Sequence, residues 1–264
     1  MKELLLSRTD RHVATLTIHR PEKMNSLTPA LLLELHKIIE ELAATDDIRA
    51  IVLRGAGDNA FCAGYDITEL PTRVSADPTK RDLTENPIDL AVGSIVNYPY
   101  PVIAMLNGHA FGGGLELATN CDIRIASNDI RFGLPPAKLG IVYPLGGMIR
   151  FVQTIGFPKT KELLFTGRTF DAQRGLEMGL IDHILPRDRL ESFVYEMADE
   201  IAAGAPLSLK GTKRILNLLS NCFHLEEKDK AEAETLILEA FNSEDLKEGQ
   251  AAFVEKREPV FRGK

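Results

Sequence analysis

A buried run of apolar residues that leads into three consecutive glycines constrains this chain more than any other feature. Residues 102–106 read as a buried strand, residues 112–114 are the glycines, and residues 115–119 favour a helix. A helix that begins on glycines leaves backbone N–H groups unpaired at its N-terminus, where the dipole favours negative charge and no Cβ keeps a ligand away. The junction therefore predicts a site that stabilises an oxyanion, with Glu116 beside it. A tight packing turn is the alternative.

Strand and helix signals alternate along the first two thirds of the chain. Residues 12–19 carry alternating apolar side chains, as a half-buried strand does, and a helix that starts with Thr-Pro is expected over residues 28–45. Further strands are expected over residues 49–54, 101–106 and 123–126, with a loop over 55–70 and a polar surface segment over 71–87. This alternation predicts an α/β core in which helices pack on sheets.

From about residue 186 onward the pattern becomes almost wholly helical. Helical spacing extends over residues 189–203, 206–219, 225–241 and 243–256. A run of helices after an α/β core predicts an appended layer that makes oligomer contacts or covers a site.

Charge and cysteine content narrow the class of partner. The net charge of −7 argues against nucleic acid as the main partner, because such partners usually need a basic face. An anionic ligand must then be held by local cations. The three cysteines lack disulfide or metal spacing and fit a reducing compartment. No apolar run is long enough for a signal peptide or a membrane span, so a cytoplasmic protein without a membrane partner is expected.

Two segments together resemble the enoyl-CoA hydratase/isomerase (crotonase) superfamily. Residues 63–67 read Ala-Gly-Tyr-Asp-Ile, and residues 112–122 read Gly-Gly-Gly-Leu-Glu-Leu-Ala-Thr-Asn-Cys-Asp. Further blocks of sequence match the family's pattern in the same order along the chain, at residues 23–27, 161–168, 179–182 and 252–257. The similarity therefore covers essentially the whole chain.

This resemblance implies a fold and a ligand. The implied fold is an α/β, ClpP-like spiral of ββα units that binds acyl-CoA over residues 1–195. An all-helical trimerisation region over residues 196–264 is implied to follow it. The implied ligand is an acyl-CoA thioester, with no metal and no separate cofactor, and the implied assembly is a homotrimer or a dimer of trimers.

The resemblance also implies roles for individual residues. By position, the backbone N–H groups of Ala63 and Gly113 should form the oxyanion hole, and Glu116 matches the first of two family glutamates. The second belongs in a Phe-Gly-x-Pro-Glu block, but residues 132–136 read Phe-Gly-Leu-Pro-Pro. Proline cannot exchange a proton, so addition of water by two carboxylates lacks one group. Other matching positions are expected to bind acyl-CoA: Lys23, Asn25, Leu27, Gly64, Tyr65, Asp66, Ile67, Gly112, Pro136, Phe253 and Lys256.

Within the superfamily, the chain looks most similar to methylmalonyl-CoA decarboxylases, on residues 66–71, 139–143 and 255–261. Tyr143 falls where that group places an active-site tyrosine, whereas Tyr65 replaces its histidine. Loss of CO₂ next to a thioester leaves an enolate, which an oxyanion hole stabilises without a second acid. The expected activity is that of a lyase that decarboxylates methylmalonyl-CoA or a similar short branched acyl-CoA.

Three alternatives stay open. The first is an enoyl-CoA hydratase or isomerase that uses Glu116 as its main acid/base, and the second is a non-catalytic, RNA-binding relative. In the third, Tyr143 is a core aromatic residue and Glu116 only stabilises a helix dipole.

Overall fold

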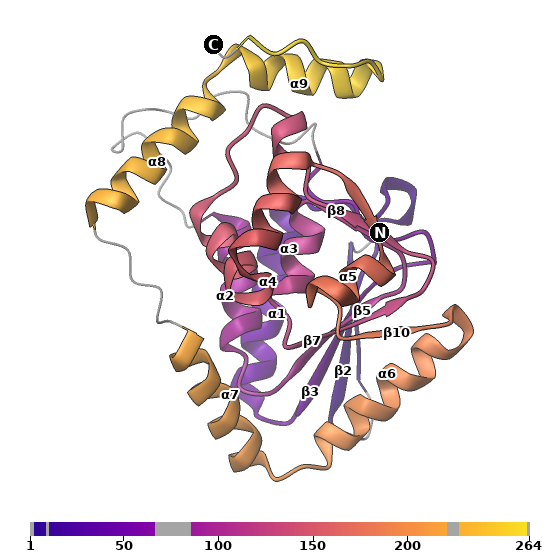
Figure 1. Ribbon diagram of the computed structural model, residues 1–264. Helices are drawn as coiled ribbons and strands as arrows, with labels where there is room; N and C mark the ends of the chain where they lie inside the picture. The colour runs from indigo at the N-terminus through magenta and orange to yellow at the C-terminus, as the bar shows by residue number, and fades with distance from the viewer. Residues whose placement is uncertain (1–2, 9–10, 67–85, 221–226, 263–264) are drawn as a thin grey trace.

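A computed structural model describes residues 3–8, 11–66, 86–220 and 227–262 (Figure 1). Its larger sheet has the strand order β1-β2-β3-β5-β7-β10. β1 runs antiparallel to β2, and the other neighbours are parallel. These strands are β1 (Leu4–Arg8), β2 (Val13–Ile18), β3 (Ala50–Gly55), β5 (Val102–Leu106), β7 (Ile123–Ser127) and β10 (His183–Leu185).

The smaller sheet has the order β4-β6-β8-β9, with β8 and β9 antiparallel. Its strands are β4 (Ala60–Cys62), β6 (His109–Phe111), β8 (Arg131–Gly133) and β9 (Thr169–Asp171). Three times along the chain, a strand of the larger sheet is followed by one of the smaller sheet and then by a helix. These helices are α2 (Pro87–Asn97), α3 (Gly113–Thr119) and α4 (Leu145–Thr166). The expected α/β spiral of ββα units is thereby confirmed.

Helices cover both faces of the larger sheet. α1 (Pro29–Thr45) and α2 pack on one face, and α6 (Arg187–Ala202) crosses the other, as Figure 1 shows. In β3, Ile51 and Leu53 join the first cluster, whereas Ala50 and Val52 join the second. This alternation explains why the parallel strands are apolar almost throughout.

Most predicted elements occur within one or two residues of their expected bounds. The helix expected over residues 28–45 is α1, and the Thr28 hydroxyl accepts a hydrogen bond from the N–H of Leu31 at 3.1 Å. The loop expected over residues 55–70 is wrong in part, because it contains β4. β6 was also missed, since a strand of three residues is too short to show a period. Residues 71–85 of the expected surface segment lie outside the described residues.

The predicted boundary between residues 195 and 196 falls inside α6. The buried face of α6 packs on the sheet through Leu190, Val194, Ala198 and Ala202. α6 is therefore part of the α/β core, and the appended helices begin at Pro206. They are α7 (Pro206–Ser220), α8 (Glu227–Phe241) and α9 (Glu244–Glu255).

The appended helices attach to the core unequally. Nζ of the buried Lys213 in α7 donates to Asp122 at 2.7 Å and to the Tyr100 carbonyl at 2.9 Å. α9 packs closely on the segment after η4 (Pro136–Lys138), because a Cβ on Gly249 would lie 2.6 Å from the carbonyl oxygen of Leu139. α8 and α9 otherwise stand away from the two sheets (Figure 1). Within the described ranges, no helix is long and apolar enough to cross a membrane.

Candidate active site

The two segments singled out in the sequence meet in the fold. β4 and β6 are parallel neighbours, so the segments after them emerge at the same sheet edge. Gly64 follows β4 with a φ of 95°, and Gly112 follows β6 with a φ of 50°. A Cβ on Gly64 would lie 2.9 Å from the Phe111 carbonyl oxygen and 3.3 Å from the nitrogen of Gly113. Both the backbone conformation and this close approach require glycine.

The structure corrects one of the two predicted oxyanion donors. The N–H of Ala63 donates to the carbonyl oxygen of Met24 at 3.0 Å, so it is engaged within the protein. The N–H groups of Tyr65 and Gly113 have no hydrogen-bond partner among the described residues. A Cβ on Gly113 would lie 3.5 Å from Cδ2 of Tyr65, so the two residues are close neighbours. The structure therefore offers Tyr65, not Ala63, as the donor beside Gly113.

Pairing with Leu27 explains why the N–H of Tyr65 is unpaired. The N–H of Leu27 donates to the carbonyl of Gly64 at 2.8 Å, and the N–H of Asp66 donates to the carbonyl of Leu27 at 2.9 Å. Leu27 lies opposite Tyr65 in a parallel bridge, so its hydrogen bonds go to the two neighbours of Tyr65, which are Gly64 and Asp66. The carbonyl of Gly64 and the N–H of Tyr65 belong to one trans peptide group and point in opposite directions. Because that carbonyl points toward Leu27, the N–H of Tyr65 points away from it.

Glu116 and Tyr143 form a buried pair next to this turn. Glu116 lies in α3, and the Tyr143 hydroxyl, from the segment before α4, donates to its Oε2. The two residues are only 5% and 8% exposed. Burial raises the pKa of Glu116 to about 7, although the hydrogen bond from Tyr143 lowers it in part. Burial also raises the pKa of Tyr143 well above its usual value. Glu116 can therefore take up or release a proton near neutral pH.

Gly147, in the first turn of α4, makes room for this pair. A Cβ at this position would lie 2.7 Å from Oε1 of Glu116 and 2.5 Å from Cε1 of Tyr143. Any side chain would push the two groups apart. Gly147 was not predicted from the sequence, because a lone glycine in a helical pattern belongs to no motif.

Tyr65, Leu27 and residues of α2 surround the other side of the turn. A Cβ on Gly113 would lie 3.2 Å from Cδ1 of Ile88 and 3.3 Å from Cδ1 of Leu27. Burial raises the pKa of Tyr65 to about 12, and the charges of Asp89 and Glu116 add to this effect. Burial raises the pKa of Asp89 too. Asp89 thus brings a second carboxyl group near the site, one that no sequence motif announced.

Asn25 and Asp66 are placed to support the loop. Asn25 donates through Nδ2 to the carbonyls of Ala56 and Ala60, at 3.0 and 2.7 Å, and accepts from the N–H of Arg20 through Oδ1 at 3.0 Å. Asp66 pairs with the Arg20 guanidinium at 3.3 Å. Asn25 therefore acts through the backbone that it holds, which makes it a positioning residue.

The remaining predicted residues are scattered around the fold. Pro136 is buried and begins η4, where its carbonyl accepts from the N–H groups of Leu139 and Ile141. Lys23, Phe253 and Lys256 are exposed, and the last two lie at the end of α9. Ile67 lies outside the described residues.

Comparison with known proteins identifies the family. A family model described as enoyl-CoA hydratase/isomerase matches residues 8–264. The chain is 35% identical to a short-chain-enoyl-CoA hydratase of Clostridium acetobutylicum, over 93% of this chain and 92% of the relative. It is 32% identical to the methylmalonyl-CoA decarboxylase of Escherichia coli, over 97% and 96% of the two chains.

A solved structure agrees with this result. Methylmalonyl-CoA decarboxylase in complex with 2-nitronate-propionyl-CoA matches with a TM-score of 0.91 and 31% identity, over 100% of this chain and 99% of that one. The glycine turn, the facing loop and the spiral of ββα units thus occur together in a chain that belongs to the enoyl-CoA hydratase/isomerase (crotonase) superfamily of acyl-CoA enzymes.

Proposed function

We propose that the protein decarboxylates methylmalonyl-CoA, or a similar short branched acyl-CoA, through a thioester enolate. The observation that carries this proposal is the buried Tyr143–Glu116 pair beside the glycine turn, together with proline in place of the second acid at position 136. The reaction needs an oxyanion hole, a means to orient a carboxylate and a proton source. The residues at the turn offer all three.

In the proposed reaction, the N–H groups of Tyr65 and Gly113 bind the thioester oxygen. The bond between the α-carbon and the carboxylate breaks, CO₂ leaves, and its electron pair forms the enolate that these donors stabilise. When Glu116 is protonated, it donates to the Tyr143 oxygen and frees the phenol proton to orient the departing carboxylate. The enolate α-carbon then takes a proton from this pair, which gives the decarboxylated acyl-CoA.

A second candidate is hydration or isomerisation of a 2-enoyl-CoA. One observation favours it, because Asp89 brings a second carboxyl group to the same site as Glu116. The two groups would then divide the roles of acid and base. At the position where the family usually has its second acid, this chain has Pro136. We therefore prefer decarboxylation to hydration as the proposed reaction.

A two-substrate assay separates these functions. We expect CO₂ release from methylmalonyl-CoA and very slow loss of the enoyl absorbance of crotonyl-CoA. Pro136→Glu, which restores the family's acid, serves as the comparison for hydration. Rapid hydration by the native protein with no CO₂ from methylmalonyl-CoA would exclude the decarboxylase and favour the alternative.

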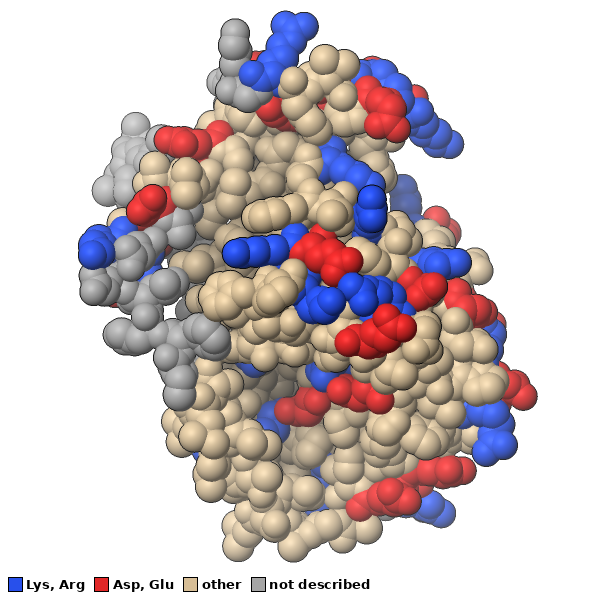
Figure 2. All heavy atoms as spheres, viewed as in Figure 1, with Lys and Arg blue, Asp and Glu red and all other residues tan. Residues whose placement is uncertain are grey.

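RNA binding is the least supported of the alternatives. On the face shown in Figure 2, basic and acidic side chains are interspersed rather than segregated. The net charge of −7 also opposes attraction to a polyanion. Acyl-CoA is therefore the proposed ligand, with CoA entering as part of the substrate and no other cofactor.

We also propose a homotrimer or a dimer of trimers, which the resemblance to the family implies and which the exposed apolar surface of α7 supports. Five of its apolar side chains are between 51% and 84% exposed: Leu207, Ile215, Leu216, Leu218 and Leu219. A cluster of this kind is costly to leave in water and marks an interaction site. Light scattering at micromolar concentration should give three or six times the chain mass of 29.2 kDa. Leu219→Glu should weaken the assembly, whereas Leu33→Glu on α1 should not; a monomeric native protein would contradict the inference.

A further inference from the structure

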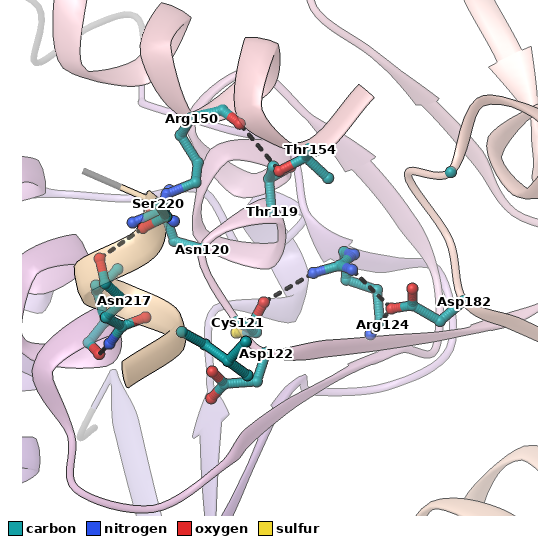
Figure 3. A pocket seen from close by; sticks show the side chains of 13 residues that line it. Thr119, Asn120, Cys121, Asp122, Arg124, Arg150, Thr154, Asp182, Asn217 and Ser220 are labelled. Atoms are coloured by element: carbon teal, nitrogen blue, oxygen red, sulfur yellow. Dashed lines mark hydrogen bonds and ion pairs between the residues drawn. The ribbon is translucent and has the colours of Figure 1, made fainter. Parts of the chain in front are cut away.

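A polar cavity of about 410 Å³ lies between the end of α3, the middle of α4 and the end of α7. Figure 3 shows that charged and amide side chains line it. Asn120, which follows α3, is part of its wall, and so is Arg150 of α4. None of the residues assigned above to the acyl-CoA site lines this cavity. Leu216 of its wall belongs to the α7 surface proposed above for subunit contacts, so the cavity lies beside that interface.

The carboxylates in the wall are already compensated. Asp122 accepts from the N–H of Val102 and from Nζ of Lys213, both at 2.7 Å. Asp182 accepts from the N–H of Arg124 at 2.7 Å and pairs with Nη2 of the same residue at 2.8 Å. Each acid thus has its own cation, so the two pairs leave no net charge in the cavity.

Arg150 is the cation that remains. It lines the cavity, and within the described part of the chain its guanidinium has no hydrogen bond or ion pair. Only its carbonyl oxygen is engaged, by the hydroxyl of Thr154 at 2.9 Å. Burial lowers the pKa of Arg150, although the nearby charge of Asp122 raises it in part. A guanidinium presents a planar set of five N–H donors that suits carboxylate and phosphate oxygens.

Two other polar atoms of this wall lack partners among the described residues. They are Nε of Arg124, which is a donor, and Oδ1 of Asn120, which is an acceptor. Both atoms are buried from solvent, so Arg150 is the group through which the cavity would bind an anion. The cavity is within the size range of small-molecule sites in proteins.

We propose that this cavity is a second ligand site, which binds a small oxyanion, such as a carboxylate or a phosphate, with Arg150 as its main contact. The site lies at one end of α3, while Gly113 and Glu116 lie in its first turns. α3 has seven residues, and a helix of that length spans roughly 10 Å. Nδ2 of Asn120 donates to the backbone carbonyl of Glu116 at 2.8 Å, so the wall of the cavity is tied to the residue proposed for proton transfer.

A structural role for Arg150 is the competing explanation. α3 and α7 both end at this cavity, and the carbonyl ends of helices carry partial negative charge that a cation stabilises. In that case the guanidinium would serve the helix ends and need no ligand. The two roles differ in what removal of the charge does to anion binding.

Isothermal titration with inorganic phosphate and with malate, at constant ionic strength with chloride as the reference anion, tests the proposal. We expect saturable binding of at least one anion to the native protein. Arg150→Gln should weaken it at least tenfold, and Arg150→Lys should weaken it less. Arg168→Gln, which removes the same charge from an exposed position outside this cavity, should leave binding unchanged. A preference between phosphate and malate distinguishes the two sources of the oxyanion.

The outcomes separate clearly, because the titration contains no acyl-CoA and does not depend on the proposed reaction. Equal binding by Arg150→Gln and the native protein would overturn the proposal and assign the anion to another site. Absence of saturable binding to the folded native protein would also overturn it. Such a result, with a lower melting temperature for Arg150→Gln, would assign Arg150 to the helix ends.

Discussion

Tyr143→Phe is expected to lower the rate of CO₂ release by on the order of 10²–10⁴-fold, the usual effect of losing a proton-transfer group. The change deletes only the hydroxyl that donates to Glu116, and leaves the ring and its edge contact with Phe151 in place. Acyl-CoA affinity should change little, because the oxyanion donors belong to the backbone. The measurement is kcat and KM for methylmalonyl-CoA.

The pH profile distinguishes this role from a structural one. Since the pKa of Glu116 is raised to about 7, its carboxyl holds a proton below that pH and releases it above. A rate that needs the acid form should fall as pH rises through about 7. The bond from Tyr143 lowers this pKa, so in Tyr143→Phe the fall should move to higher pH. Tyr195→Phe, which removes a hydroxyl bonded to Thr15 at 2.8 Å, is the matched control. An unmoved profile in Tyr143→Phe would exclude the proposed coupling.

Gly113→Pro is expected to slow turnover by on the order of 10²–10³-fold, since it removes one oxyanion donor. Gly113 is the first residue of α3, where proline is compatible with helical geometry and the missing N–H breaks no helical bond. The variant should therefore fold. Loss of rate should appear in kcat for any acyl-CoA that the enzyme uses, whichever reaction follows.

Gly113→Ala provides the control, because it adds a Cβ but keeps the N–H. The Cβ would lie 3.2 Å from Ile88 and 3.3 Å from Leu27, both at the flexible ends of side chains, so a small adjustment accommodates it. Alanine should thus cost much less than proline. Equal turnover of the proline variant and the native protein would remove Gly113 from the oxyanion hole.

The sequence predicted which segments form the candidate site, but it did not predict correctly which backbone N–H groups face the ligand. The glycine turn and the loop after residue 62 were expected to face each other, and they do. The donor in that loop was placed at Ala63, two residues from the N–H that is unpaired. Which peptide group faces the turn depends on the bridge between Leu27 and Tyr65, a tertiary contact that no local pattern encodes.

Other parts of the site depend on contacts between distant segments. Glu116 and Tyr143 were each selected from their positions in motifs, but their hydrogen bond depends on how α4 returns to α3. Asp89 and Gly147 belong to no motif, and only the fold brings them to the site. The long elements were predictable because their apolar periods extend over several turns, as in α1.

Gly147 has a consequence for attempts to make this enzyme more heat-resistant. Glycine inside a helix costs roughly 0.5–1 kcal/mol relative to alanine, so both Gly146 and Gly147 in the first turn of α4 are obvious targets for replacement. A Cβ on Gly146 would meet no atom within 4 Å, whereas a Cβ on Gly147 would strike the carboxyl group of Glu116. Helix propensity treats these two adjacent positions alike, but only a substitution at Gly147 would disturb the active site. A screen for thermal resistance alone is enough to identify alanine at Gly146 as acceptable. A screen must also measure turnover if it is to reject alanine at Gly147.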